Sequence, residues 1–234
     1  MLISGIQKFT MLDYPGKSAC IVFTPGCNFR CGYCHNPEFV LPERIAELKS
    51  SFIPEEAFMN FLEQRKGLLE GVVVTGGEPT LMPDLLDFMK KIKELGFLVK
   101  LDSNGNRPEV LKKALEQKIV DYIAMDVKTS LDEYARLVGK LVKPENIAES
   151  IKLIMDSGLE YEFRSTIVKE THLPETLKAM AKLISGSTNF YLQNFRAANT
   201  LSPEFQRYHS FTNQEMEEIA DLFRTQVKNV AIRI

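Results

Sequence analysis

The sequence lacks a long apolar run, an excess of charge of either sign and a leader-like beginning. No stretch approaches the roughly 18–20 apolar residues that span a bilayer, so no membrane segment is expected. Lysine and arginine total 29 against 31 aspartates and glutamates, a net charge of −2, which argues against a basic surface that binds nucleic acid. Residues 1–8 do not combine a basic segment with a long apolar one. We therefore expect a cytoplasmic protein that binds neither membranes nor nucleic acid.

Tryptophan is absent and cysteine is scarce, with four residues among 234. The share of 44% hydrophobic and 26% charged residues is nonetheless that of a globular protein. No linker divides it, so we expect one domain over residues 1–234. Three cysteines, Cys27, Cys31 and Cys34, lie close together, whereas Cys20 lies in an apolar run. Such clustering in a reducing compartment argues against disulfides and favours a metal site.

Short apolar runs alternate with longer segments of helical period, which predicts strands followed by helices. The expected strands cover residues 19–24, 71–75, 97–102, 121–127, 160–168 and 188–194. The expected helices cover residues 54–66, 83–95, 108–117, 145–157, 174–185 and 213–227. Six such units predict an α/β fold with a parallel sheet, and because a complete barrel needs about 250 residues, we expect a partial (β/α)6 TIM-like barrel. Residues 1–10 and 230–234 are expected to add edge strands.

Polar clusters follow the predicted strands at their C-terminal ends. They are residues 27–35, 76–78, 102–105, 126–128 and 193–194, and Arg164 lies within the fifth predicted strand. In a β/α barrel these strand ends form one rim, where active sites lie. The rim is therefore the predicted active site.

The three clustered cysteines have the spacing Cys-x3-Cys-x2-Cys. Three thiolates from one loop can hold three irons of a [4Fe–4S] cluster and leave the fourth iron without a protein ligand. Cys31 to His35 also matches the haem-attachment pattern, but that pattern leaves Cys27 unexplained. A zinc site with three cysteines would need the adjacent Cys34 and His35 on one ion, and an electron-transfer ferredoxin would need a fourth cysteine. The spacing favours the open iron–sulfur cluster, with zinc as the main alternative.

The cysteine motif, with an aromatic residue before its third cysteine, and Gly76-Gly77-Glu78-Pro79 after the second strand resemble the radical S-adenosylmethionine enzymes. This resemblance implies a [4Fe–4S] cluster whose unique iron binds the amino and carboxylate groups of S-adenosylmethionine. One electron then cleaves the cofactor to methionine and a 5′-deoxyadenosyl radical, which takes a hydrogen atom from a substrate. No residue of the protein is then required as a catalytic acid or base.

Within that superfamily, residues 34–37, 101–105 and 125–128 resemble the glycyl-radical-enzyme activases. The opening segment, residues 8–17, is most similar to the activating protein of anaerobic ribonucleoside-triphosphate reductase. The resemblance implies a glycyl radical enzyme as protein substrate and a low-potential electron donor such as flavodoxin or ferredoxin. Two other functions stay open: a radical enzyme acting on a small molecule, as a deazapurine synthase does, and a non-catalytic iron–sulfur or zinc module.

The resemblance also implies a set of residues around S-adenosylmethionine. They are Tyr33, His35, Gly76, Gly77, Glu78, Asp102, Ser103, Asn104, Asp126, Lys128, Arg164 and Gln193. The glycines would let the backbone approach the ligand, and Lys128 would neutralise its carboxylate. In some activases the residues that match Asp102, Asp126 and Ser103 also hold a monovalent cation.

Several of these residues have a second interpretation. Asp102 and Asn104 are also common turn formers, and Arg164 could point to the ligand or form an ion pair with Asp126. Gln193 or Asn194 stands where some activases have a histidine that contacts the ribose, and this sequence has no histidine there. We expect His172 and His209 to be solvated loop residues.

Overall fold

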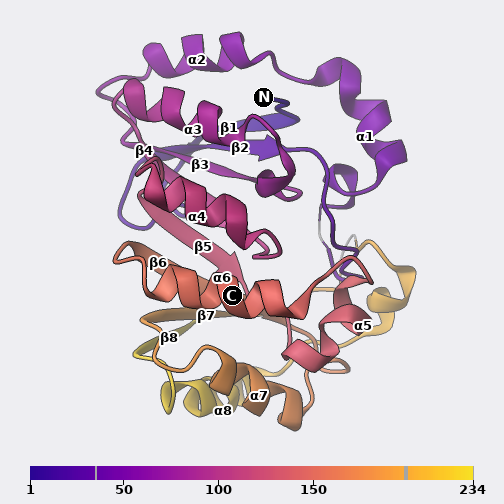
Figure 1. The fold of residues 1–234 in the computed structure, drawn as a ribbon. Coiled ribbons are helices and arrows are strands. Elements are labelled where there is room, and N and C mark those ends of the chain that lie inside the picture. The colour runs from indigo at the N-terminus through magenta and orange to yellow at the C-terminus, as the bar shows by residue number, and fades with distance from the viewer. Residues whose placement is uncertain (35, 198–199, 234) are drawn as a thin grey trace. The chain divides into compact units, whose positions relative to one another are not determined.

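Strands and helices alternate along the chain in the computed structural model, which describes residues 1–34, 36–197 and 200–233 (Figure 1). The strands are β1 (Gly5–Thr10), β2 (Ala19–Thr24), β3 (Gly71–Gly76), β4 (Leu98–Ser103), β5 (Tyr122–Asp126), β6 (Glu160–Ile167), β7 (Asn189–Asn194) and β8 (Asn229–Arg233). The α-helices are α1 (Pro42–Leu48), α2 (Glu55–Glu63), α3 (Leu85–Glu94), α4 (Pro108–Glu116), α5 (Tyr134–Val138), α6 (Pro144–Met155), α7 (Pro174–Leu183) and α8 (Asn213–Arg224).

The strands follow one another through the sheet in chain order, from β1 to β8. Strand β1 is antiparallel to β2, whereas β2 and β3, β3 and β4, β6 and β7, and β7 and β8 are parallel pairs. A helix lies between each pair of consecutive parallel strands along the chain, as parallel connections require. The linear order and the βα alternation confirm the predicted α/β fold with a sheet that does not close into a full barrel.

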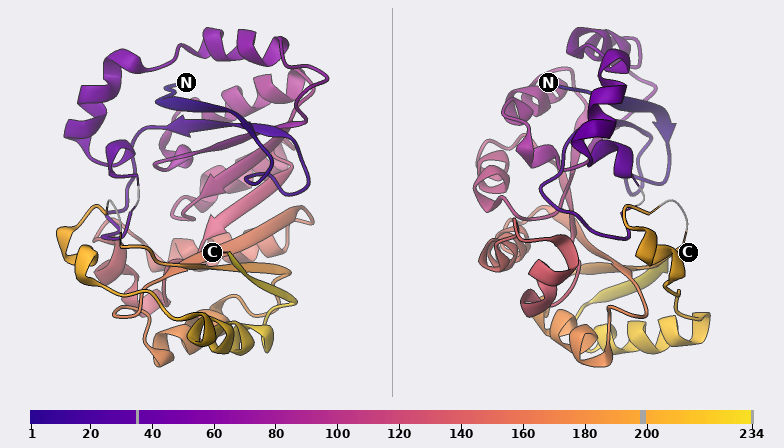
Figure 2. Two further views of the ribbon diagram at one scale, coloured as in Figure 1. Left: turned by 180° about the vertical axis from the view of Figure 1, so that it is seen from behind. Right: turned by 90° about the vertical axis from the view of Figure 1, so that its right-hand side faces the viewer.

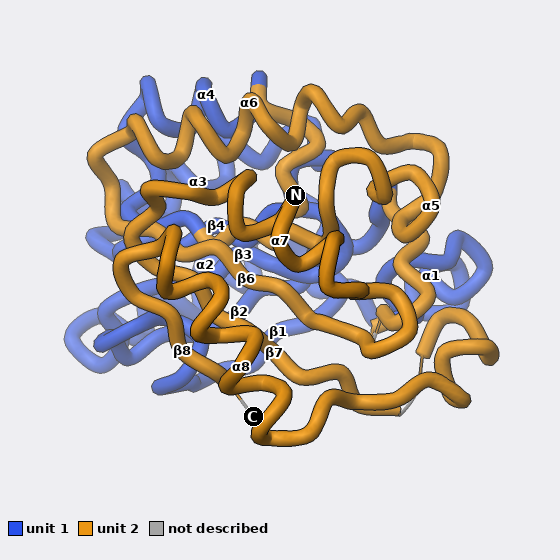
Figure 3. Tube along the Cα trace, turned by 90° about the horizontal axis from the view of Figure 1, so that it is seen from below, with its two compact units in different colours: residues 1–28, 37–103, 109–123 blue, residues 29–36, 104–108, 124–234 orange. Residues whose placement is uncertain are grey.

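The described residues form two compact units (Figure 3). The first unit comprises residues 1–28, 37–103 and 109–123, and the second comprises residues 29–36, 104–108 and 124–234. Strand β5 begins in the first unit and ends in the second.

The core of the first unit is built on β3 and β4. Val72 and Val74 of β3 and Val99 and Leu101 of β4 are fully buried, as expected of parallel strands that helices cover. The register pairs Val74 with Leu101. Helix α3 contacts β4, so its apolar stripe covers one face of this part of the sheet.

The second unit has its own core around strands β6, β7 and β8. Phe163, Phe190 and Phe223 are fully buried, and the rings of Phe190 and Phe223 stack with 4.5 Å between their centroids. Helix α8 packs on β7, β8 and α7 (Figure 2). It begins with a capping box at Thr212, whose hydroxyl accepts from the N–H of Glu215, an arrangement that satisfies backbone donors at a helix start.

The predicted elements all have counterparts in the structure. The strand expected at residues 19–24 coincides with β2, and the expected edge strands are β1 and β8. Helices α1 and α5 were not predicted. In the described residues no helix is both long and apolar enough to cross a membrane.

Candidate active site

The cysteine motif occupies the loop that follows β2. None of the four cysteines, all of which are described, forms a disulfide. Cys27 and Cys34 are half-buried, and Cys31 is buried. Cys20 lies inside β2 and is fully buried, and this burial raises the pKa of its thiol to about 12. Its position in the strand makes Cys20 part of the core rather than of the loop.

Backbone hydrogen bonds hold the part of the loop that carries two of the thiols. In the second unit the N–H of Cys34 donates to the carbonyl of Cys31 at 2.9 Å, which closes a turn. The N–H of Leu201 donates to Cys34, and the N–H of Ser202 donates to the carbonyl of Gly32 at 2.9 Å. The residues that follow β7 therefore fix the turn between these two cysteines.

Tyr33 lies in this turn and is buried against an aromatic ring. Its ring centroid is 6.0 Å from that of Phe205, and a side chain at Gly32 would collide with the same Phe205 ring. The hydroxyl of Tyr33 is buried and finds no hydrogen-bond partner among the described residues. A buried hydroxyl without a partner is costly, so this group favours a ligand that supplies one.

The glycine pair after β3 is required by backbone packing within the first unit. The N–H of Gly77 donates to Thr24 at 2.8 Å, and the N–H of Glu78 donates to Gly26 at 2.7 Å. A Cβ on Gly76 would collide with the backbone of Thr24, and one on Gly77 would collide with that of Gly26. Gly76 also has φ +120°, which disfavours other residues. The two glycines thus attach the 76–78 segment to the start of the cysteine loop.

Glu78 directs its carboxylate into the same unit and is buried. Its Oε1 accepts from the hydroxyl of Thr80 at 2.6 Å and from that of Ser103 at 2.9 Å. It also accepts from the Thr80 N–H at 3.2 Å and so caps the short 3₁₀ turn Pro79–Leu81. The Glu78 carboxylate thus fixes this loop. Contact with S-adenosylmethionine remains a prediction for Glu78 and Ser103.

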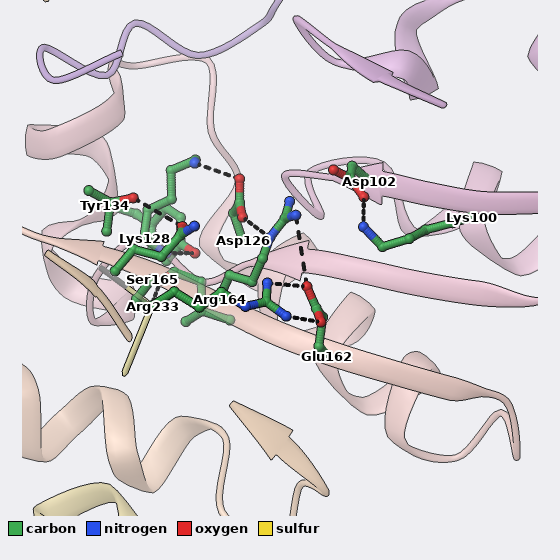
Figure 4. A network of polar contacts seen from close by, with 12 residues as sticks. Lys100, Asp102, Asp126, Lys128, Tyr134, Glu162, Arg164, Ser165 and Arg233 are labelled. Carbon is green, nitrogen blue, oxygen red and sulfur yellow. Dashed lines mark hydrogen bonds and ion pairs between the residues drawn. The ribbon is translucent and has the colours of Figure 1, made fainter. Parts of the chain in front are cut away.

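Asp102 lies one residue before the end of β4 and forms an ion pair that the sequence analysis missed. Lys100, two residues earlier on the same face of the strand, places its Nζ 2.8 Å from Oδ1 of Asp102 (Figure 4). The Lys100 side chain is 2% exposed and that of Asp102 is 14% exposed. The alternation Lys-x-Asp in a strand was the available signal, because residues i and i+2 share a face.

Asp126 ends β5 and is held by two cations of the second unit. Its carboxylate accepts from Nε of Arg164 at 2.9 Å and from Nζ of Lys128 at 3.1 Å (Figure 4). Burial alone would raise the pKa of Asp126, but the two cations hold it well below its usual range. The ion pair considered for Arg164 is therefore present. Asp126 stays ionised at neutral pH.

A second carboxylate extends this network. Glu162 is 1% exposed and receives two hydrogen bonds from the Arg233 guanidinium, at 2.9 and 2.8 Å. Arg164 also approaches Glu162, with 3.9 Å between the paired atoms. Among the described residues of the second unit, the carboxylates of Asp126 and Glu162 thus lie against the cations of Lys128, Arg164 and Arg233.

Lys128 is fixed through its backbone by a histidine expected to be solvated. His172 is 1% exposed, so that expectation is wrong. The N–H of Val168 donates to Nδ1 of His172 at 3.0 Å, which leaves the ring proton on Nε2 to donate to the carbonyl of Lys128 at 2.9 Å. The N–H of Lys128 donates to the hydroxyl of Tyr134 at 2.9 Å. His209 is exposed and binds Glu170, as expected of a solvated residue.

Lys128 also lies near the cysteine loop. Burial raises the pKa of the Cys31 thiol to about 11, and the positive charge of Lys128 works in the opposite direction. A cation close to a thiol favours the thiolate, which is the form that binds metal.

The remaining predicted residues have mixed outcomes. Asn104 uses its side-chain oxygen to accept from the N–H of Asn106 at 3.0 Å, so it does form the turn considered for it. Asn194 is hydrogen-bonded to the backbone of Phe211, whereas the side-chain oxygen of Gln193 accepts from the Thr166 hydroxyl at 3.4 Å. Their roles in ligand binding stay predictions, and His35 lies outside the described residues.

A [4Fe–4S] cluster with one open iron needs three thiolate ligands from the protein. No three His, Cys, Asp or Glu side chains of the described residues gather into a ready-made ion site. Cys27 belongs to the first unit, and Cys31 and Cys34 belong to the second. The three loop thiols nonetheless supply the ligand type and number for three irons of a [4Fe–4S] cluster.

Comparison with known protein families is consistent with this chemistry. The model of the radical SAM superfamily, in which SAM denotes S-adenosylmethionine, matches residues 21–184. The chain belongs to the radical SAM superfamily. It is accordingly a radical SAM enzyme, and the family implies a [4Fe–4S] cluster and S-adenosylmethionine as its cofactors.

Two curated relatives and one solved structure are similar to this radical SAM enzyme. A Methanocaldococcus jannaschii protein, provisionally named as a glycyl-radical enzyme activating enzyme, is 33% identical over 99% of this chain and 95% of its own length. The 7-carboxy-7-deazaguanine synthase of Thermococcus kodakarensis is 26% identical over 76% of this chain and 74% of its own. A crystallised domain of the pyruvate formate-lyase-activating enzyme from Bacteroides vulgatus shares the fold, with a TM-score of 0.57 and 15% identity over 70% of this chain and 99% of that one.

Proposed function

We propose that this radical SAM enzyme activates a glycyl radical enzyme. The observation that carries the proposal is the similarity, at 33% identity, to a relative named as a glycyl-radical enzyme activating enzyme, because it extends over almost the whole of both chains. The similarity to the deazaguanine synthase is lower and leaves about a quarter of each chain unmatched. We further propose that residues 1–234 act as one catalytic domain.

The cofactors would supply the radical chemistry. When bound, the cluster and S-adenosylmethionine would supply the radical chemistry that removes a hydrogen atom from the Cα of a glycine in the partner. Cys27, Cys31 and Cys34 would hold three irons as thiolates. Lys128, whose Nζ lies beside Asp126, would attract the carboxylate of S-adenosylmethionine, and the buried hydroxyl of Tyr33 would gain a partner. The protein would thus bind and orient the cofactor without a catalytic acid or base.

For the partner we propose anaerobic ribonucleoside-triphosphate reductase, and for the electron donor a flavodoxin or ferredoxin. The partner assignment is supported by the opening segment, residues 8–17, because this segment is most similar to the activating protein of that reductase. Within that segment the hydroxyl of Thr10 donates to Asp13 at 2.5 Å, and the N–H of Leu12 donates back to Thr10 at 3.1 Å. The segment is therefore an ordered turn, and the side chain of Leu12 is 88% exposed.

The decisive experiment uses electron paramagnetic resonance. The anaerobically reconstituted enzyme is mixed with S-adenosylmethionine, dithionite and one candidate glycyl radical enzyme at a time. We expect the doublet of a glycyl radical in the ribonucleotide reductase. A doublet only in another glycyl enzyme would overturn the partner assignment and keep the activase function. Formation of 5′-deoxyadenosine without a doublet in any candidate would contradict the function and favour a small-molecule substrate.

Two cysteine variants form a matched pair, in which one is the test and the other is its control. Cys34→Ser removes a proposed cluster ligand and should abolish the doublet, because the cluster loses one of its three thiolates. Cys20→Ala removes a thiol that is buried inside β2 and should leave the doublet in place. A reduced flavodoxin replacing dithionite then tests the proposed donor.

A further inference from the structure

A lysine lies in the middle of the buried strand β4. Lys100 is 1% exposed, and its neighbours Val99 and Leu101 are fully buried. An ammonium group is rarely buried unless it is paired, because it loses its hydration. The identity of the partner therefore indicates what Lys100 does.

That partner is Asp102. The Nζ of Lys100 is 2.8 Å from Oδ1 of Asp102, and it lies 5.8 Å from the centroid of the Tyr122 ring, a distance at which a cation is attracted to an aromatic face. All three residues belong to the first unit. The ammonium is thus a fixed positive charge next to the Asp102 carboxylate.

The second carboxylate is paired in the same way within its own unit. Asp126 has the Lys128 ammonium at 3.1 Å and the Arg164 guanidinium at 2.9 Å. Asp102 and Asp126 are the two carboxylates that the sequence analysis considered as ligands of a monovalent cation. Each of them already has a cation from its own chain.

We propose that Lys100 is a built-in counter-cation of Asp102, so that this enzyme binds S-adenosylmethionine without a monovalent metal ion. The Lys100 ammonium donates to Oδ1 of Asp102 at 2.8 Å and so directs one oxygen of that carboxylate. Lys100 is therefore a positioning residue that acts through Asp102. This inference concerns the S-adenosylmethionine pocket and does not depend on which partner the enzyme activates.

The first test uses the unmodified enzyme. The affinity of the reconstituted enzyme for S-adenosylmethionine is measured by calorimetry in potassium, sodium and tetramethylammonium chloride at equal ionic strength. We expect the three dissociation constants to agree within about twofold, a difference of about 0.4 kcal/mol. Binding that weakens about tenfold or more in tetramethylammonium chloride would overturn the proposal. This result is independent of the glycyl radical assay, so the failure of either proposal can be recognised separately.

The second test removes the ammonium. Lys100→Met keeps the length of the side chain without its charge, and should weaken S-adenosylmethionine binding about tenfold in tetramethylammonium chloride, with partial recovery in sodium or potassium chloride. Lys100→Arg should remain independent of the salt cation. Lys93→Met is the matched control, because Lys93 forms an ion pair with Asp121 in the same unit at 2.6 Å but lies on helix α3. Unchanged binding by Lys100→Met in tetramethylammonium chloride would contradict the proposal.

A third readout needs no cofactor. The thermal unfolding midpoint of the apoprotein should be the same in the three salts for the natural sequence. For Lys100→Met it should be higher in sodium or potassium chloride than in tetramethylammonium chloride, because a metal ion can then take the vacated place beside Asp102. A dependence on the salt cation in the natural sequence would count against the proposal even if Lys100→Met did not fold.

Discussion

The two compact units hold their candidate site residues in place by different kinds of contact. In the first unit the site is shaped by backbone contacts: Gly76 and Gly77 lie against Thr24 and Gly26. In the second unit the site is shaped by charge, with the Asp126 and Glu162 carboxylates shared among three cations. We infer that the glycine segment of the first unit depends on close packing that admits no side chain, and that the Asp126 and Glu162 cluster of the second unit depends on neutralisation of charge. Substitutions in each unit can break this contrast.

The largest effect is expected from Gly77→Ala in the first unit. The new methyl group would collide with the backbone of Gly26, and backbone cannot move aside as a side chain can. We expect a loss of about 3 kcal/mol in the free energy of unfolding, measured by urea denaturation, together with reduced iron incorporation. Gly5→Ala is the control, because its Cβ would meet only the Phe23 side chain at 3.8 Å. Equal stability of the two variants would contradict a backbone-packed first unit.

The next effect is expected from Arg164→Met in the second unit. Asp126 would keep Lys128 but lose its hydrogen bond to Arg164, at a cost of about 2 kcal/mol in stability, and the pKa of Asp126 would rise. Because the pKa of Asp126 is lowered in the folded protein, its contribution to stability is present above about pH 4 and is lost as the pH falls. The variant should therefore lose less stability than the natural sequence between neutral pH and pH 3.

Arg164→Lys sharpens this measurement. It keeps a positive charge beside Asp126, so part of the acid-dependent stability should return, although a lysine cannot reproduce the planar guanidinium. If Arg164→Met and Arg164→Lys were equally stable at neutral pH and titrated alike, charge neutralisation would not be what the second unit requires.

The smallest effect is expected from His172→Asn, which weakens the hydrogen bond to the Lys128 carbonyl. Burial lowers the pKa of His172, and the positive charge of Arg136 acts in the same direction. The folded protein thus disfavours protonated His172, so its stability is complete above about pH 6.5 and declines as the pH falls below that value. We expect the variant to lose about 1 kcal/mol at pH 8 and to lack this decline.

His209→Asn is the matched control for His172→Asn, because the His209 side chain is 74% exposed. Its stability at pH 8 should lie within about 0.5 kcal/mol of that of the natural sequence. A pH dependence that disappears in His209→Asn and persists in His172→Asn would show that the buried imidazole is not its source.

Strands such as β2 were predictable because each is built on a continuous apolar run. Strand β2 has the apolar run that a strand covered on both faces needs, and its predicted and observed bounds coincide at residues 19–24. Helix α5 has only five residues, too few for a helical period to be recognised. Short elements therefore escaped prediction where long periodic ones did not.

The same limit applies to the site. Cys27, Asp102 and Asp126 could be proposed as ligands from their places at or just after the ends of strands. The burial of His172 could not, because its ring binds the carbonyl of Lys128, which lies in another loop far away in the sequence. Lys100 was overlooked because a lysine in a strand usually points to solvent, and only the packing around β4 shows that it is buried.

The central claim, an iron–sulfur cluster held by three loop thiols that leaves one iron for S-adenosylmethionine, is tested most directly by iron analysis with cofactor cleavage. After anaerobic reconstitution and reduction we expect about four irons per chain and formation of 5′-deoxyadenosine. Both should be retained in Cys20→Ala and lost in Cys34→Ser. Full iron content and undiminished 5′-deoxyadenosine formation in Cys34→Ser would contradict the claim.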